Sequence, residues 1–409
     1  MNDVRTVVEN IYYVGVDDKR KHDEKQLKKF ENIWPIPYGI SYNAFLIVDE
    51  KVALIDLVDE AFADDLIKKI KSITDLERVD YIILNHMEPD HTGALPKILE
   101  HAKNAKILVS KRGINMVKDF YGIDESKIIE AKDNMELKLG KRTLRFIMAP
   151  FLHWPETMFT YVVEDKILFT CDAFGAYGAL NGKLFDDEVD LEHYLSEGKH
   201  YYSNIVSPYA NFVQRAIQRV KKENLEIKIL APSHGPLYRT DILRILDFYD
   251  RLSRWVPERK VVIVYGSMYG FTKKMVDFVK AELEKHDIPV KLYDASYSDL
   301  SDMITDILDS PVLMVGTPTY DAQIYPPVQV VMHMVKTKRF KSKPVGIFGV
   351  FGWGGGALEK LKTMLEGMKF IVLEPIVGSR GMPTQEVYEQ LKQLVNTVVE
   401  IVNKEIEKQ

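Results

Sequence analysis

The sequence contains a single cysteine, Cys171, among its 409 residues. One cysteine excludes an intrachain disulfide, a CxxC redox pair and any four-cysteine iron or zinc module within this chain. Cys171 ends the apolar stretch KILFTC, and we therefore expect it to be a small buried side chain. Redox or metal chemistry in this chain must use other residue types.

Long apolar runs and an excess of basic charge are also missing. No run approaches the roughly 18 residues that span a bilayer, and the start, NDVRTVVENIYYVGV, has no basic-then-apolar signal pattern. We therefore expect a cytoplasmic protein without membrane partners. Lys and Arg number 55 against 60 Asp and Glu, a formal net charge of −5. Since nucleic-acid binding needs a basic face, we expect no nucleic-acid partner.

The chain is too long to fold around a single hydrophobic core. We therefore predict an α/β protein of two domains. We place the boundary within RLSRWVPERK (251–260), which gives domains 1–254 and 255–409. The first domain mixes β-strand patterns with crossing helices, as expected of two stacked sheets with helices outside. The second shows five apolar strands, each followed by a helix, which predicts a doubly wound parallel five-stranded sheet.

The first domain gathers seven metal-capable side chains, all in loops that follow apolar strands. Four of them stand within the stretch NHMEPDHTG. Seven donors are too many for one tetrahedral ion and suit two ions that share a carboxylate. We predict one group of His86, Glu88 and His153, a second of Asp90, His91 and His234, and Asp172 as the bridge.

A lone histidine after a strand is usually an ordinary hydrogen-bonded residue, and the dense HxExDH run therefore carries the metal prediction. The remaining six histidines stand in charged or helical surroundings. We expect these on the surface or in packing: His22, His101, His193, His200, His286 and His333.

The stretch YGSMYGFT (265–272) joins the first strand and helix of the second domain. Hydroxyls and backbone N–H groups at such a place receive a phosphate, and the stretch resembles the phosphate loop of flavodoxins. The loops GTPTYDA and GVFGWGGGA follow the third and fourth strands, where a flavin ring would lie. No GxGxxG occurs at the first turn, which favours flavin mononucleotide (FMN) over a dinucleotide. The predicted cofactor-binding residues are Ser267, Met268, Tyr269, Gly270, Phe271, Thr272, Thr317, Pro318, Thr319, Tyr320, Asp321, Ala322, Phe351, Gly352, Trp353, Gly354, Gly355 and Gly356.

The run HxExDH with later His, Asp and His resembles the metallo-β-lactamase fold, an αββα sandwich. In hydrolases of that fold the second ligand is usually histidine and the metal zinc, whereas Glu88 stands here. A carboxylate at that position favours iron. With HWPETMF, APSHG and the flavodoxin-like half, the chain resembles A-type flavodiiron proteins over essentially its whole length.

This resemblance implies FMN and two irons per chain, and reduction of dioxygen to water, of nitric oxide to nitrous oxide, or both. It implies a head-to-tail homodimer, or a dimer of dimers, in which each flavin faces the partner's irons, with Trp353 at that junction. Tyr201 resembles a tyrosine beside the irons, with an ordinary core tyrosine as the alternative. Asp56 resembles a supporting aspartate, with a solvated acid as the alternative.

The resemblance leaves the electron donor open between reduced deazaflavin (coenzyme F-420), used by members from methanogenic archaea, and rubredoxin. The Lys/Ile/Glu-rich composition favours the deazaflavin. Two other functions stay in view: a zinc hydrolase with an accessory flavodoxin domain, and an electron-transfer protein whose metal site is structural.

Overall fold

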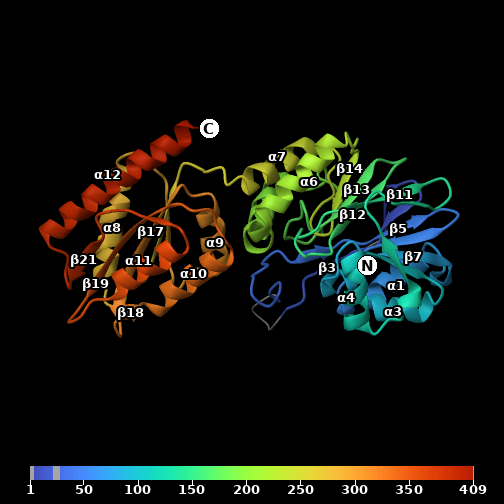
Figure 1. Cartoon of the computed structure of the whole chain (residues 1–409), viewed down its shortest axis with the longest axis horizontal. Helices are drawn as coiled ribbons and strands as arrows, with labels where there is room; N and C mark the ends of the chain where they lie inside the picture. The colour runs from blue at the N-terminus through green and yellow to red at the C-terminus, as the bar shows by residue number, and fades with distance from the viewer. Residues whose placement is uncertain (1–3, 22–27, 409) are drawn as a thin grey trace. The chain divides into compact units, whose positions relative to one another are not determined.

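The computed structural model describes residues 4–21 and 28–408, so that His22 lies outside the described residues. The chain divides into two compact units, Met1–Ser253 and Arg254–Gln409 (Figure 1). Each unit is described separately below.

Two sheets form the centre of the first unit, ordered β1-β2-β5-β6-β7-β8-β9 and β10-β11-β12-β13-β14. The larger sheet comprises β1 (Arg5–Val8), β2 (Ile11–Tyr13), β5 (Phe45–Val48), β6 (Val52–Ile55), β7 (Val79–Ile83), β8 (Lys106–Ser110) and β9 (Ile128–Ala131). The smaller comprises β10 (Glu136–Lys138), β11 (Thr143–Met148), β12 (Met158–Val162), β13 (Ile167–Cys171) and β14 (Ile229–Pro232). A separate pair joins β3 (Val16–Asp18) to β4 (Ile40–Tyr42).

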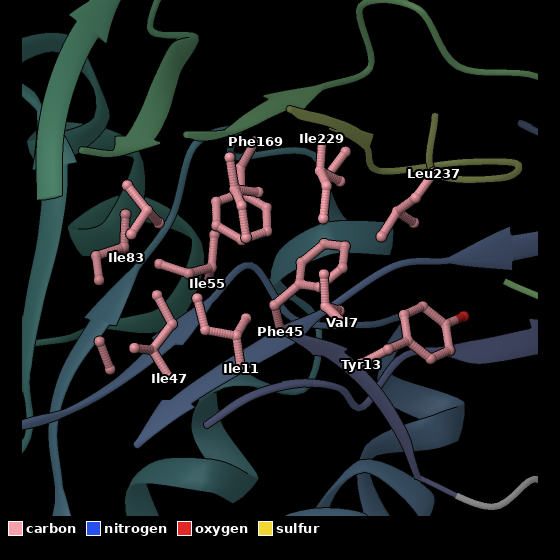
Figure 2. Close-up of a cluster of buried hydrophobic side chains, with 14 of the residues drawn as sticks. Val7, Ile11, Tyr13, Phe45, Ile47, Ile55, Ile83, Phe169, Ile229 and Leu237 are labelled. Atoms are coloured by element: carbon pink, nitrogen blue, oxygen red, sulfur yellow. The ribbon is translucent and has the colours of Figure 1, made fainter. Parts of the chain in front are cut away.

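The core of this unit lies between the two sheets. Phe45 and Ile55 come from the larger sheet, and Phe169 and Ile229 come from the smaller one (Figure 2). The Phe45 and Phe169 rings lie 4.6 Å apart between centroids. Cys171, at the end of β13, is buried as predicted. Apolar side chains of both sheets therefore face each other, as a sandwich requires.

Helices cover the outer faces of the sandwich. Figure 1 shows α1 (Ala63–Lys71), α3 (Leu95–His101) and α4 (Lys111–Tyr121) on the side of the unit opposite α6 (Ala210–Lys222) and α7 (Ile242–Ser253). Helix α6 buries Val213, Ile217 and Val220, spaced three and four residues apart, and so presents one apolar face. The predicted αββα architecture is confirmed.

A parallel sheet ordered β16-β15-β17-β19-β20 forms the second unit. Its strands are β15 (Val261–Tyr265), β16 (Val290–Asp294), β17 (Val312–Tyr320), β19 (Pro344–Phe351) and β20 (Ile371–Val372), with β18 (Gln323–Ile324) and β21 (Val377–Arg380) paired to β17 and β19. Its helices are α8 (Phe271–Glu284), α9 (Leu300–Leu308), α10 (Pro326–Thr337), α11 (Ala357–Gly367) and α12 (Gln385–Glu407). In chain order the strands run 2-1-3-4-5, the flavodoxin arrangement. Among the described helices, none is both long and apolar enough to cross a membrane.

The fifth of the predicted apolar strands, FIVLEPIVG, is not continuous in the structure. It consists of β20 and β21, which pair with the two ends of β19. Pro375 lies between them and has no N–H group, and it therefore cannot donate a hydrogen bond to the sheet. The doubly wound fold is unaffected.

Candidate active site: a buried metal cluster and a flavin pocket

All seven predicted metal-binding side chains lie at the ends of strands of the two sheets in the first unit. The run from His86 to His91 follows β7, with Glu88 at the start of the short helix α2 (Pro89–Thr92). His153 stands in the loop between β11 and β12. Asp172 follows β13 and His234 follows β14, and these strands are parallel. Their carboxyl ends therefore meet at one edge of the sheet.

The first predicted group is close enough to share one ion. Ligand atoms of His86, Glu88, His153 and Asp172 all lie within 4.8 Å of one another. Glu88 Oε2 lies 3.0 Å from His153 Nε2 and 3.3 Å from His86 Nε2. These are the separations expected of atoms that converge on one point from different directions.

The second predicted group is equally compact. Ligand atoms of Asp90, His91 and His234 lie within 4.8 Å of one another. Asp90 Oδ2 lies 3.3 Å from His91 Nε2 and 3.4 Å from His234 Nε2. Two imidazoles and one carboxylate again converge.

Asp172 connects the two groups through its two oxygens. Its Oδ2 lies 3.1 Å from His153 Nε2 and 3.3 Å from His86 Nε2. Its Oδ1 lies 3.0 Å from His91 Nε2 and 3.3 Å from His234 Nε2. Each oxygen faces a different group, which is the arrangement of a carboxylate that bridges two ions.

Partners outside the cluster fix the orientation of two imidazoles. Glu156 Oε1 lies 2.7 Å from His86 Nδ1 and also accepts a hydrogen bond from the Met87 N–H at 2.9 Å. His234 Nδ1 lies 2.7 Å from the backbone carbonyl of Ser41. In both rings Nδ1 then carries the proton and Nε2 is left free to bind a metal. Sequence reasoning missed both partners, although Glu156 stands three residues after His153 in the quoted motif HWPETMF.

Asp56 is buried and binds Asn85 rather than an imidazole, accepting from its backbone N–H at 2.7 Å and from its side-chain amide at 2.9 Å. The alternative of a solvated acid is therefore wrong. Asp56 supports the residue that directly precedes His86. Its effect on the cluster is indirect.

The carboxylates of the cluster stabilise positive charge at this point. Burial opposes protonation of His91, but Asp90 and Asp172 outweigh it and raise its pKa to about 9. Burial likewise opposes protonation of His153, yet the neighbouring carboxylates of Asp172 and Glu88 raise its pKa to about 9. Burial, reinforced by the negative charges of Glu88 and Asp172, raises the pKa of Asp90 to about 6 against the opposing effect of His91. A pair of metal ions would supply the positive charge that the site favours.

Buried ligand atoms without hydrogen bonds test whether this donor set fits metal ions. Among the described residues, both oxygens of Asp90 and of Asp172, and Nε2 of His91 and His234, are buried and have no hydrogen-bond partner. Buried polar atoms are rarely left unpaired in proteins. Four imidazoles and three carboxylates in this geometry fit two metal ions that prefer nitrogen and oxygen, as iron does. Of the other histidines that the structure describes, none belongs to the cluster.

Tyr201 lies beside this cluster. It ends α5 (Leu191–Tyr201), directly before the π-helical turn Tyr202–Val206. Its ring centroid is 5.4 Å from that of His234, and its buried hydroxyl has no hydrogen-bond partner within the described part of the chain. Turns of π-helix often occur at functional sites. The position suits a residue that acts beside the metals.

A cavity of about 380 Å³ in the second unit lies among the three predicted flavin loops. Most of the predicted residues line it: Ser267, Met268, Tyr269, Phe271, Thr272, Pro318, Thr319, Tyr320, Asp321, Ala322, Phe351, Gly352, Trp353 and Gly354. Val350 and Gly381 also line it and were missed. Gly381, at φ 73°, is in the left-handed region that favours glycine. The sequence feature that could have identified it is the glycine within the stretch SRGMP.

Four predicted flavin residues do not line this cavity. Thr317 is buried, and its hydroxyl accepts a hydrogen bond from the Tyr325 N–H at 3.2 Å. Gly270 and Gly356 stand at the starts of α8 and α11, and Gly355 lies outside the lining residues. Thr317 and these glycines belong to the three loops but do not line the cavity.

The start of α8 has the features of a phosphate site. Ser267 Oγ accepts hydrogen bonds from the N–H groups of Gly270 at 3.1 Å and Lys273 at 3.4 Å, so that its hydroxyl lies at the helix N-terminus. Thr272 is buried in the first turn and also lines the cavity. Partial positive charge at a helix start favours a phosphate. Trp353, which lines the same cavity, is 89% exposed.

A metallo-β-lactamase-like domain with a binuclear donor set, joined to a flavodoxin domain, defines a flavin- and metal-containing oxidoreductase. Comparison with known proteins agrees: the family described as ODP family beta lactamase matches residues 40–235, and the flavodoxin family matches residues 263–393. The nitric oxide reductase of Moorella thermoacetica is 37% identical, covering 93% of this chain and 94% of that protein.

Two solved structures have the same architecture throughout. The rubredoxin oxygen:oxidoreductase from Desulfovibrio gigas has a TM-score of 0.94 at 30% identity, covering 99% of this chain and 100% of its own. The flavodiiron protein from Giardia intestinalis has a TM-score of 0.93 at 28% identity, covering 99% of this chain and 98% of its own. The chain belongs to the flavodiiron protein family. The predicted fold, the oxidoreductase class and the cofactors, FMN and two irons, are thereby confirmed.

Proposed function

We propose that this chain reduces nitric oxide to nitrous oxide and dioxygen to water. The observation that carries the proposal is Asp172, whose two oxygens face two separate donor groups in a buried cluster. The chain that carries this cluster also carries a flavin pocket. The names of the Moorella and Desulfovibrio relatives support the two substrates.

We assign the metal cluster to a diiron domain, residues 1–254, and the flavin pocket to an FMN domain, residues 255–409. The metal ligands in this assignment are the seven side chains of the cluster. The flavin residues are those that line the cavity together with the glycines that shape its loops. Tyr201 and Trp353 are assigned to catalysis, beside the irons and beside the flavin.

Two ferrous ions and a reduced flavin supply four electrons, enough to take dioxygen to water or four nitric oxide molecules to two of nitrous oxide. The residues of this chain provide the shape of the site. Glu156 and the Ser41 carbonyl hold the His86 and His234 rings. The Glu88 and Asp90 side chains are 12% and 11% exposed, whereas the His86, His91 and His234 side chains are fully buried. Because both oxygens of Asp90 are buried, we infer that substrate reaches the cluster on the Glu88 side.

A second copy of the chain is part of the proposal. Trp353 and Tyr269, both at the flavin pocket, are 89% and 83% exposed. Large exposed apolar side chains beside a cofactor favour a protein partner over that surface. We propose the head-to-tail homodimer implied by the resemblance, in which each flavin faces its partner's irons, with assembly into a dimer of dimers open. A cytoplasmic location stays a prediction.

The electron donor we propose is rubredoxin, supported by the name of the Desulfovibrio enzyme. Reduced coenzyme F-420, favoured by composition alone, is the alternative. Anaerobic stopped-flow reduction of the bound flavin by each donor in separate runs distinguishes them. Saturable reduction by F-420 at the rate of turnover, beside slow reduction by rubredoxin, would reverse this choice.

The substrate proposal is tested with the iron- and FMN-loaded protein, reduced without oxygen and mixed with nitric oxide or dioxygen. We expect flavin reoxidation with each gas, nitrous oxide from the first and no released peroxide from the second. If the loaded, reduced protein consumes neither gas, the reductase proposal is excluded and the electron-transfer alternative is supported. Zinc without iron, in protein made with both metals supplied, would support the hydrolase alternative.

A further inference from the structure

A second cavity, of about 580 Å³, lies in the first unit and shares no lining residue with the metal cluster. Four segments form it: the chain after β3, the chain before β4, the loop that contains residues 179–183, and the start of α5. Its volume is in the range of about 300–1,000 Å³ that small-molecule sites occupy. The proposed function assigns it no role.

Three lysines line this cavity. They are Lys19, Lys21 and Lys183, and within residues 4–21 and 28–408 none of them has a carboxylate partner. The Lys19 ammonium donates to the amide oxygen of Asn181, which is neutral. Elsewhere lysines often pair with acids, as Lys51 does with Asp80 at 3.0 Å. Positive charge is thus concentrated in a concave part of a chain whose net charge is −5.

The nearby carboxylates bind backbone groups and not these lysines. Asp190, the acid that lines the cavity, accepts from the His193 N–H at 3.3 Å and caps α5. The two oxygens of Asp17 accept from the N–H groups of Leu180 and Asn181, each at 2.8 Å. Both acids therefore hold the walls of the cavity in place. Each acid is hydrogen-bonded to backbone N–H groups, one of them at a helix start, and keeps its negative charge.

Aromatic side chains form a further part of the wall. The exposed Tyr38 ring packs edge-on against the His193 ring, with centroids 4.6 Å apart. The Tyr194 hydroxyl donates to the carbonyl of Ala179 at 2.8 Å, which joins α5 to the loop that carries Lys183. The cavity is therefore bounded by segments that hydrogen bonds and ring contacts hold together.

We propose that this cavity binds a small oligoanion, a molecule that carries two or more phosphate or carboxylate groups. The three lysines and Asp190 leave about two net positive charges around the cavity, more than a single negative charge would neutralise, and lysine binds such groups as a point charge. The concave shape favours a small molecule over the acidic surface of a protein. The inference goes beyond the proposed function and does not depend on it.

Calorimetric titration of the iron- and FMN-loaded protein tests this, with tripolyphosphate and citrate as separate probes at constant ionic strength. The site variant is Lys19→Glu with Lys183→Glu. The matched control, Lys103→Glu with Lys141→Glu, changes the net charge equally at two exposed lysines that do not line the cavity. Thermal unfolding of all proteins confirms that they fold. If the site variant does not, Lys183→Ala replaces it.

We expect saturable binding of one probe molecule per chain. Removal of one ammonium group that binds the anion should weaken binding roughly tenfold, giving about tenfold for Lys183→Ala, more than about 100-fold for the charge-reversing double variant and little change for the control. Binding of tripolyphosphate alone would identify a phosphate ligand, and binding of citrate alone a carboxylate ligand. Absence of saturable binding by both probes, or equal weakening in the control, would overturn the proposal.

Discussion

Removal of the Glu156 carboxylate should weaken iron binding without touching a metal ligand. Glu156 Oε1 lies 2.7 Å from His86 Nδ1 and accepts from the Met87 N–H at 2.9 Å. It therefore fixes both the rotation of the His86 ring and the nitrogen that carries the proton. In Glu156→Ala the ring can rotate, and its N–H loses the acceptor at 2.7 Å and keeps only the Thr157 hydroxyl, 3.5 Å away.

Two independent estimates give the size of this effect. Loss of such an outer partner typically lowers metal affinity about 10- to 100-fold. A hydrogen bond to a charged acceptor contributes about 1.5–3 kcal/mol, which corresponds to roughly 10- to 150-fold. Glu156→Gln keeps an acceptor oxygen but loses the charge, and we expect about three- to tenfold weaker binding. The predicted order of iron affinity is parent, glutamine variant, alanine variant.

The assay is anaerobic ferrous-iron titration of metal-free protein against a competing chelator. Glu282→Ala is the matched control, because Glu282 is a buried glutamate of the flavin unit, bonded to Lys285. Its iron affinity should equal that of the parent. If Glu156→Ala binds both irons with parental affinity, the orienting role assigned to Glu156 is refuted.

Three further predictions concern the bridge, the phosphate loop and a buried lysine. Asp172→Ala removes the carboxylate that faces both groups and should lower iron content and turnover together; full iron and activity would exclude it from the site. Replacing Ser267 and Thr272 by alanine should weaken FMN binding while iron stays bound, and unchanged FMN affinity would contradict the loop assignment. Burial lowers the pKa of Lys343 from 10.5 to about 7. Between these pH values the unfolded chain binds the extra proton, so that stability rises with pH, by about 2 kcal/mol from pH 7 to 9. In Lys343→Met the free energy of unfolding, measured with denaturant, should no longer rise between pH 7 and 9. An equal rise in the parent and the variant would refute the assignment to Lys343.

The spacing of residues along the chain was enough to predict the first part of the metal site and the fold of the second unit. Four donors within NHMEPDHTG, directly after an apolar strand, must lie near one another whatever the rest of the chain does. The regular alternation of apolar strands and helices after residue 260 similarly required a doubly wound sheet, because unbroken apolar strands need cover on both faces. The glycine-rich loops after its strands lay where such a sheet binds ligands.

The geometry that brings distant residues together was decided by the tertiary structure. Asp172, already predicted as the bridge, faces both donor groups because β13 and β14 run parallel and the two sheets stack, and no spacing in the sequence reveals this packing. Glu156 lies 70 positions from His86, and the carbonyl of Ser41 lies 193 positions from His234. A backbone carbonyl has no residue identity that a sequence could display. The lysine-lined cavity likewise draws on four separate segments. The covalent chain fixes which residues are neighbours over a few positions, whereas sheet packing fixes which distant side chains converge.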